Sequence, residues 1–160
     1  QEIKVVNING ALNVFAKYLN SIKQKWLITH DINKGRHKLI IAHDGEKQIK
    51  YYLLFKREFF LSADKQFGTK EGYFESINEE WLNFTIAKKV EQIIYVYPNS
   101  FVYGVYPMQI KKYAEIHNTK RISESEDKKI INNQVETINE VIVSFPLDLL
   151  KRLNKGDGEK

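Results

Sequence analysis

The chain has 160 residues, of which 42% are hydrophobic and 28% charged, and it carries a net charge of +5. This composition excludes a disordered chain, and the absence of cysteine excludes disulfide frameworks, thiol nucleophiles and cysteine-bound zinc. No apolar run approaches the roughly 20 residues that span a bilayer, so we expect a single cytoplasmic domain over residues 1–160 with no membrane partner.

A helix followed by three strands is predicted for the first third of the chain. Apolar residues recur every three or four positions over 12–26, which indicates an amphipathic helix, and Asn9 is its expected N-cap. Asp44 and Gly45 separate two apolar runs and predict a tight hairpin. The three strands are expected at 26–30, 38–43 and 49–55.

The middle of the chain predicts a loop and then a second helix. Residues 61–75 have no clear hydrophobic period and contain two glycines, which is typical of a loop. Ser76 and Glu79 have the spacing of a capping box, so we expect the helix to begin there and to end near Lys89.

The last third predicts a hairpin, a helix, a loop and a final strand. Pro107 suits the first turn of a helix that reaches His117. Residues 118–135 are polar and charged, and we expect a mobile loop there. The other expected elements are strands at 92–97, 101–106 and 140–144, a short helix from Pro146 to Leu153, and a frayed tail at 154–160.

These elements follow the order α-β-β-β-α-β-β-α-β-α. Such alternation predicts a mixed α/β fold, in which a central mixed sheet is flanked by helices.

Positive charge is concentrated at the beginning of the chain. Residues 1–60 hold 11 Lys and Arg against 5 Asp and Glu, whereas residues 61–160 hold 14 against 15. Such a cluster suits nucleic acid, because Lys and Arg displace the counterions of phosphates; the alternative is a solvated basic face. The residues predicted to bind nucleic acid are Lys23, Lys25, Lys34, Arg36, Lys38 and Arg57.

The order of elements over about residues 11–97 resembles the core of the PD-(D/E)xK nucleases, a restriction-endonuclease-like family that includes small archaeal Holliday-junction resolvases. The resemblance implies that an acid near the start of the second core strand and an acid-x-Lys on the third bind magnesium. Lys56 matches the family lysine. Leu54 stands at the acid position before it, and His37-Lys38 stand where the family often has Pro-Asp.

Three other acids are candidates to replace the family ligands. Asp44 lies on the hairpin turn, Glu58 follows Lys56 by two residues, and Glu75 precedes the second helix. The predicted catalytic residues are therefore Lys56, Glu58 and Glu75, with magnesium held by Asp44, Glu58 and Glu75. Each acid also has a structural alternative: a turn residue for Asp44, an ion pair at a strand end for Glu58, and a favourable helix dipole for Glu75.

Two functions follow from these observations, and both stay open. The first is a magnesium-dependent DNA endonuclease or phosphodiesterase. The second is a non-catalytic DNA- or RNA-binding module on a degenerate nuclease-like scaffold, which the missing acids favour; DNA is expected ahead of RNA. A protein-interaction domain is the third alternative. Small nucleases of this type are often symmetric homodimers, and the aromatic strands at 92–106 could supply the interface.

Overall fold

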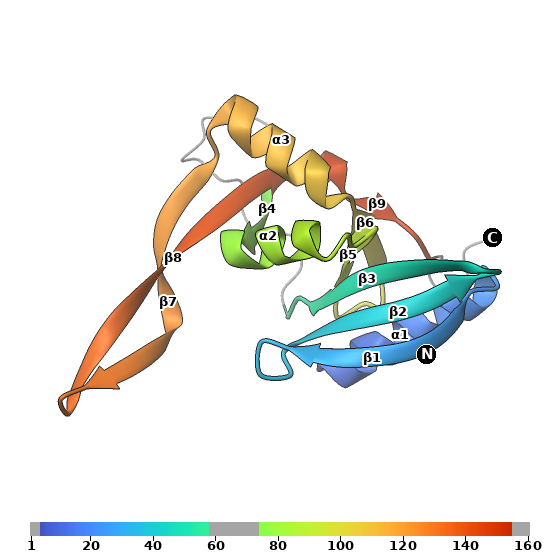
Figure 1. Ribbon diagram of the computed structural model, residues 1–160, viewed down its shortest axis with the longest axis horizontal. Helices are drawn as coiled ribbons and strands as arrows, with labels where there is room; N and C mark the ends of the chain where they lie inside the picture. Colours follow the sequence, from blue (N-terminus) through green and yellow to red (C-terminus); the bar gives the residue numbers. More distant parts are fainter. Residues whose placement is uncertain (1–3, 58–73, 155–160) are drawn as a thin grey trace.

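The computed structural model describes residues 4–57 and 74–154, and these residues form a mixed α/β fold (Figure 1). A six-stranded mixed sheet, a second sheet of three strands and three α-helices confirm the predicted fold class, and the order of elements largely follows the prediction. No helix within these two ranges is long and apolar enough to cross a membrane.

The six-stranded sheet begins with an antiparallel meander. β1, β2 and β3 are consecutive antiparallel neighbours, and the β2–β3 hairpin turns after Asp44 as predicted. β3 then pairs in parallel with β5 (Gln92–Val96), because the chain crosses over through α2 (Glu79–Ala87) before it returns to the sheet. In spatial order the strands are β1 (Lys25–Ile32), β2 (His37–Asp44), β3 (Lys47–Phe55), β5 (Gln92–Val96), β6 (Val102–Val105) and β9 (Lys151–Arg152).

Helix α1 (Ile8–Ser21) covers one face of this sheet (Figure 1). Its apolar stripe buries Phe15 against alternate residues of β3, including Tyr51 and Leu53. The cap is Asn7 instead of the predicted Asn9, since the Asn7 side chain accepts a hydrogen bond from the backbone nitrogen of Gly10 at 2.8 Å.

The opposite face of the sheet is covered by two helices and the second sheet. The intervening residues of β3, Tyr52 and Leu54, point this way and pack with Tyr95 and Phe145, so the central sheet is buried on both faces. The covering elements are β4 (Phe74–Asn78), α2 (Glu79–Ala87), α3 (Pro107–His117) and the end of β8 (Gln134–Pro146), and β8 pairs in turn with β7 (Lys120–Ile131).

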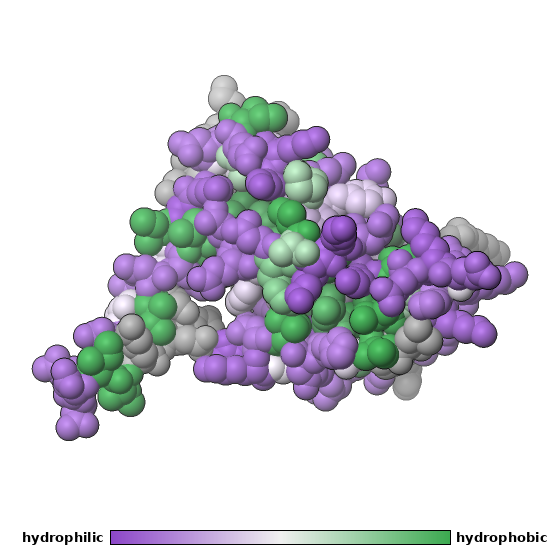
Figure 2. Space-filling view, in the orientation of Figure 1, coloured by the Kyte–Doolittle hydropathy of each residue, from purple (hydrophilic) through white to green (hydrophobic). Residues whose placement is uncertain are grey.

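The predicted mobile loop at 118–135 is wrong. Residues 120–131 form β7 and residues 134–135 the start of β8, an antiparallel hairpin that projects from the body of the molecule (Figure 1, Figure 2). The two strands satisfy each other's backbone groups, and Asn132 and Asn133 adopt the left-handed conformations that a two-residue turn requires.

The predicted start of the second helix is also wrong. Ser76 lies inside β4, and α2 begins after Asn78, whose side chain accepts a hydrogen bond from the backbone nitrogen of Glu80 at 2.8 Å. Residues 61–73 of the predicted loop lie outside the described ranges, whereas Phe74 and Glu75 belong to β4.

The predicted C-terminal helix is replaced by a short 3₁₀ helix (Leu147–Leu149) and β9. β9 pairs with β6, and this pairing satisfies backbone groups on the outer edge of β6 that a helix would leave unpaired. Asn154, the first residue of the predicted frayed tail, is anchored: it accepts a hydrogen bond from the Val102 nitrogen at 2.8 Å and donates one to the Ser100 carbonyl at 2.7 Å. The rest of that tail lies outside the described ranges.

The aromatic strands expected as a dimer interface are largely covered within the chain. Tyr95 and Tyr97 on the first of these strands are both buried in the core. The second strand, β6, is paired on both sides, with β5 and with β9.

Candidate functional site

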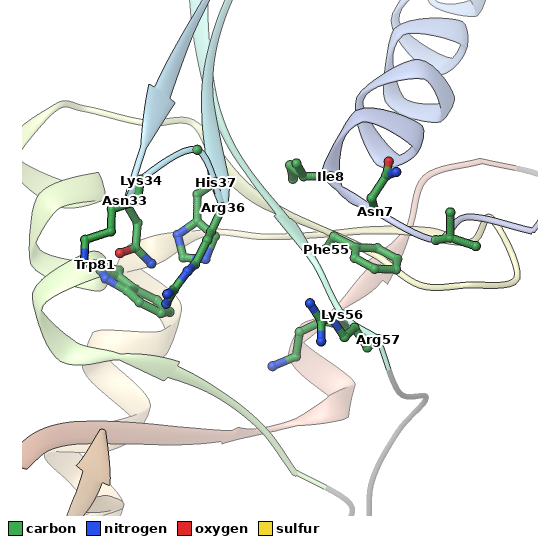
Figure 3. Close-up of a pocket in the computed structure, with 12 residues that line it drawn as sticks. Asn7, Ile8, Asn33, Lys34, Arg36, His37, Phe55, Lys56, Arg57 and Trp81 are labelled. Carbon is green, nitrogen blue, oxygen red and sulfur yellow. The ribbon is translucent and has the colours of Figure 1, made fainter. Parts of the chain in front are cut away.

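A pocket of about 780 Å³ lies at the end of the sheet where β3 stops and β2 starts. Four separate parts of the chain line it: the start of α1, the β1–β2 turn, the end of β3, and α2 (Figure 3). β3 and β5 are parallel, and the crevice beyond the carboxyl ends of parallel strands is a common place for ligands in α/β folds. The lining residues are Val6, Asn7, Ile8, Asn33, Lys34, Gly35, Arg36, His37, Phe55, Lys56, Arg57 and Trp81.

The β1–β2 turn places two cations at this pocket. Asn33, Lys34 and Gly35 have φ angles of 54°, 57° and 80°, and the Arg36 nitrogen donates a hydrogen bond to the Asn33 carbonyl at 3.1 Å. Asn and Gly adopt left-handed conformations readily, whereas a lysine does so at a cost of roughly 1 kcal/mol. The local sequence therefore folds the turn so that Lys34 and Arg36 both line the pocket.

The end of β3 adds Lys56 and Arg57, so four cationic side chains line the same pocket (Figure 3). His37 lies among them without a charge of its own. Burial, together with the nearby charges of Lys56 and Arg36, lowers the pKa of His37 from 6.5 to about 4. The pocket is consequently rich in cations and hydrogen-bond donors.

Two aromatic neighbours fix the ring of His37. Its Nδ1 lies 2.7 Å from the hydroxyl of Tyr52, which is fully buried. The ring of Trp81 meets it nearly at a right angle, with 4.3 Å between the ring centroids. Trp81 stays partly exposed and lines the pocket from helix α2.

Lys56 also contacts one of the predicted acids. Its Nζ lies 3.0 Å from Oε1 of Glu75, which also accepts from the Ser76 nitrogen, and the Tyr97 hydroxyl donates to Oε2 at 2.7 Å. Burial raises the pKa of Tyr97, and the charge of Glu75 raises it further, so this hydroxyl remains a donor. The buried carboxylate of Glu75, in β4, thus links Lys56 after the end of β3 to Tyr97 after the end of β5.

Neither position at which the resemblance implies an acid holds one. Lys38 stands where the family often has Asp, and it forms an ion pair with Asp31. Leu54 is buried and pairs with His37 across the strands. A cation and an aliphatic side chain therefore stand where the resemblance implies magnesium ligands.

The three predicted magnesium ligands do not meet. Asp44 ends β2, so it lies about 24 Å from the pocket, the length of an eight-residue strand. Glu58 lies outside the described ranges. Both oxygens of Glu75 are already engaged, and no cluster of three His, Asp or Glu suited to a metal ion occurs within the described parts of the chain. These residues do not fit a magnesium site.

Three of the six residues predicted to bind nucleic acid gather at the pocket, namely Lys34, Arg36 and Arg57. The others do not. Lys23 and Lys25 lie at the opposite end of the sheet, where Lys25 pairs with His43, and Lys38 forms an ion pair with Asp31. Asn33 and Trp81 are absent from the predicted site residues, because only the crossover of α2 brings the two to one pocket.

No protein-family model matches the chain, and neither the curated proteins nor the solved structures include one that is significantly similar to it. The pocket and its chemistry therefore carry the functional inference.

Proposed function

We propose that the protein binds nucleic acid through this basic pocket, as a non-catalytic module on a nuclease-like scaffold. One observation carries the proposal: four cationic side chains line one pocket, and no acid stands at Lys38 or Leu54, where the resemblance implies magnesium ligands. Phosphate is the ligand group that matches, because it is anionic and offers only acceptors to Lys and Arg. The resemblance puts DNA ahead of RNA as the ligand.

The order of elements supports this proposal. Helix α1, the meander β1–β3, helix α2 and strand β5 follow one another as the resemblance implies, with β4 as an addition before α2. The pocket lies at the end of that core, beside the residue that matches the family lysine. A scaffold that has cations at this pocket and lacks the two acids is suited to binding nucleic acid without cleaving it.

Replacing one pocket lysine tests the proposal. Lys34→Gln is expected to weaken binding of a fluorescein-labelled DNA oligonucleotide and to reduce the slope of log K against log salt by about 0.7 to 1, since one phosphate contact is lost. Fluorescence anisotropy over a salt series measures both quantities.

Lys47→Gln is the matched control, because Lys47 is an exposed lysine at the other end of the β2–β3 hairpin. It is expected to bind as the wild type does. Equal losses in the two variants would mean that only net charge matters, and would contradict a pocket-specific site.

A metal-dependent endonuclease is the second candidate, and the contact between Lys56 and Glu75 favours it. Duplex and single-stranded DNA incubated with magnesium, manganese or EDTA distinguish the candidates on one gel. The binding module predicts a shift without cleavage in every lane. Metal-dependent cleavage that both Lys56→Ala and Glu75→Ala abolish would instead establish the endonuclease.

A further inference from the structure

We infer that the pocket takes one unpaired nucleotide of a single strand, with its phosphate among the cations and its base against Trp81 and Phe55. This inference rests on the proposed function and adds to it the kind of strand that is bound. It predicts a preference for unpaired over duplex nucleic acid, which basic charge alone would not produce.

The first observation is a buried donor in the pocket wall. The Asn33 side-chain nitrogen is buried and has no hydrogen-bond partner among the described residues. Figure 3 shows Asn33 beside Trp81 and Arg36 at the pocket. Leaving such a donor unsatisfied destabilises the folded protein, and a phosphate oxygen would satisfy it. A cationic ligand would not, because it offers no acceptor.

The second observation is that the lining is not purely basic. Trp81 and Phe55 are both partly buried and both line the pocket, from α2 and from the end of β3. A base stacks favourably on an aromatic side chain, because every base has a flat apolar face. A ligand with an anionic part and a flat apolar part uses both kinds of lining, and a nucleotide has both.

The third observation is the size of the site. About 780 Å³ falls within the range of small-molecule pockets and greatly exceeds what one phosphate needs. Bases inside a duplex keep both faces stacked, so a base reaches a side chain in a pocket only when it is unpaired. The pocket is therefore large enough for one unstacked nucleotide.

Three probes separate the contribution of the base from that of the phosphates. A ten-nucleotide single strand, an abasic strand of the same length, and a blunt duplex of the same sequence are titrated at one salt concentration. The protein carries Trp26→Phe, so that Trp81 is its one tryptophan. The single strand is expected to bind at least tenfold more tightly than the other two and to quench Trp81 fluorescence.

Two variants with the same charge change test whether the phosphate lies against Asn33. Asn33→Asp and Asn132→Asp each add one negative charge at an asparagine whose φ is close to 50°, so the backbone tolerates both. Asn33→Asp is expected to weaken binding of the single strand at least tenfold, because a carboxylate repels the phosphate. Asn132→Asp, in the β7–β8 turn, is expected to leave binding unchanged.

Each alternative outcome has a distinct meaning. Abasic and ordinary strands that bind equally, without quenching, would overturn the nucleotide pocket and leave phosphate binding intact. A duplex that binds more tightly than the single strand would overturn it as well. Failure of all three probes to bind would contradict the proposed function itself.

Discussion

Burial keeps the His37 side chain uncharged in the folded protein, so the free energy of unfolding depends on pH. The pKa of His37 is about 4 in the folded protein and 6.5 when the side chain is exposed. Between these values the unfolded chain binds a proton that the folded protein does not bind. Stability that is present above pH 6.5 is therefore lost progressively as the pH falls toward 4.

The free energy of unfolding is expected to fall by about 2 kcal/mol between pH 7 and pH 5 through His37 alone. Urea unfolding at the two pH values measures the change, and His37→Gln is expected to remove this part of it. His43→Gln, at the far end of β2, is expected to retain it. An identical pH dependence in wild type and His37→Gln would contradict the assignment.

The two candidate functions make opposite predictions for Glu75. If the pocket binds phosphate, Glu75→Gln removes a negative charge beside Lys56 and is expected to tighten binding about fivefold, equivalent to ~1 kcal/mol. If Glu75 is catalytic, the same variant loses cleavage. Anisotropy and the cleavage gel measure the two effects.

Glu79→Gln is the matched control for that substitution. Glu79 is also a glutamate in an ion pair, with Lys120 at 2.6 Å, and it does not line the pocket. Its affinity for DNA is expected to equal that of the wild type. Weaker binding by Glu75→Gln, with Glu79→Gln unaffected, would contradict the role of Glu75 as a charge that restrains Lys56.

At the level of elements, the β7–β8 hairpin shows why a polar strand is hard to predict. Strand prediction depends on alternation between a buried and a solvated face, and much of this hairpin has no buried face. A local signal was nevertheless present, because Ile130-Ile131 and Val135 flank the pair Asn132-Asn133. Asparagine is one of the few residues that adopt the left-handed conformation of a type I′ turn.

The conformation of this turn is testable. Asn133 has a φ of 64°, which a β-branched residue adopts only with strain, so Asn133→Val is expected to destabilise the hairpin by about 1 to 2 kcal/mol. Hydrogen exchange of the β7 and β8 amides measures the loss of protection. Thr137→Val, an exposed β-branched exchange within β8, is expected to preserve protection. Unchanged exchange in Asn133→Val would contradict the turn.

At the level of the whole molecule, the sequence predicted most of the elements and only part of the site. Hydrophobic period located α1, which has a buried and an exposed face, whereas continuous apolar runs located β2 and β3, which are largely buried on both faces. The separation of Asp44 and Lys56 was also predictable. Asp44 lies at the β2–β3 turn, and Lys56 follows the far end of β3, so one strand length separates them and they could not bind the same metal ion.

The pocket itself could not be predicted, because no single segment contains it. Asn33 and Trp81 are 48 positions apart in the sequence and meet only after β3 pairs with β5 and α2 crosses over the sheet. Local patterns cannot specify that pairing. The basic residues were recognised as a group, but only the fold separates Lys34, Arg36 and Arg57 from Lys23 and Lys25.

Backbone NMR of the isotopically labelled protein, titrated with the ten-nucleotide single strand in EDTA, tests the proposed site most directly. The basic pocket predicts that amide shifts cluster at residues 7–8, 33–37, 55–57 and 81, with no requirement for a metal ion. Shifts confined to the β7–β8 hairpin or to the Lys23–Lys47 end of the sheet, or shifts that appear only when magnesium is added, would contradict it.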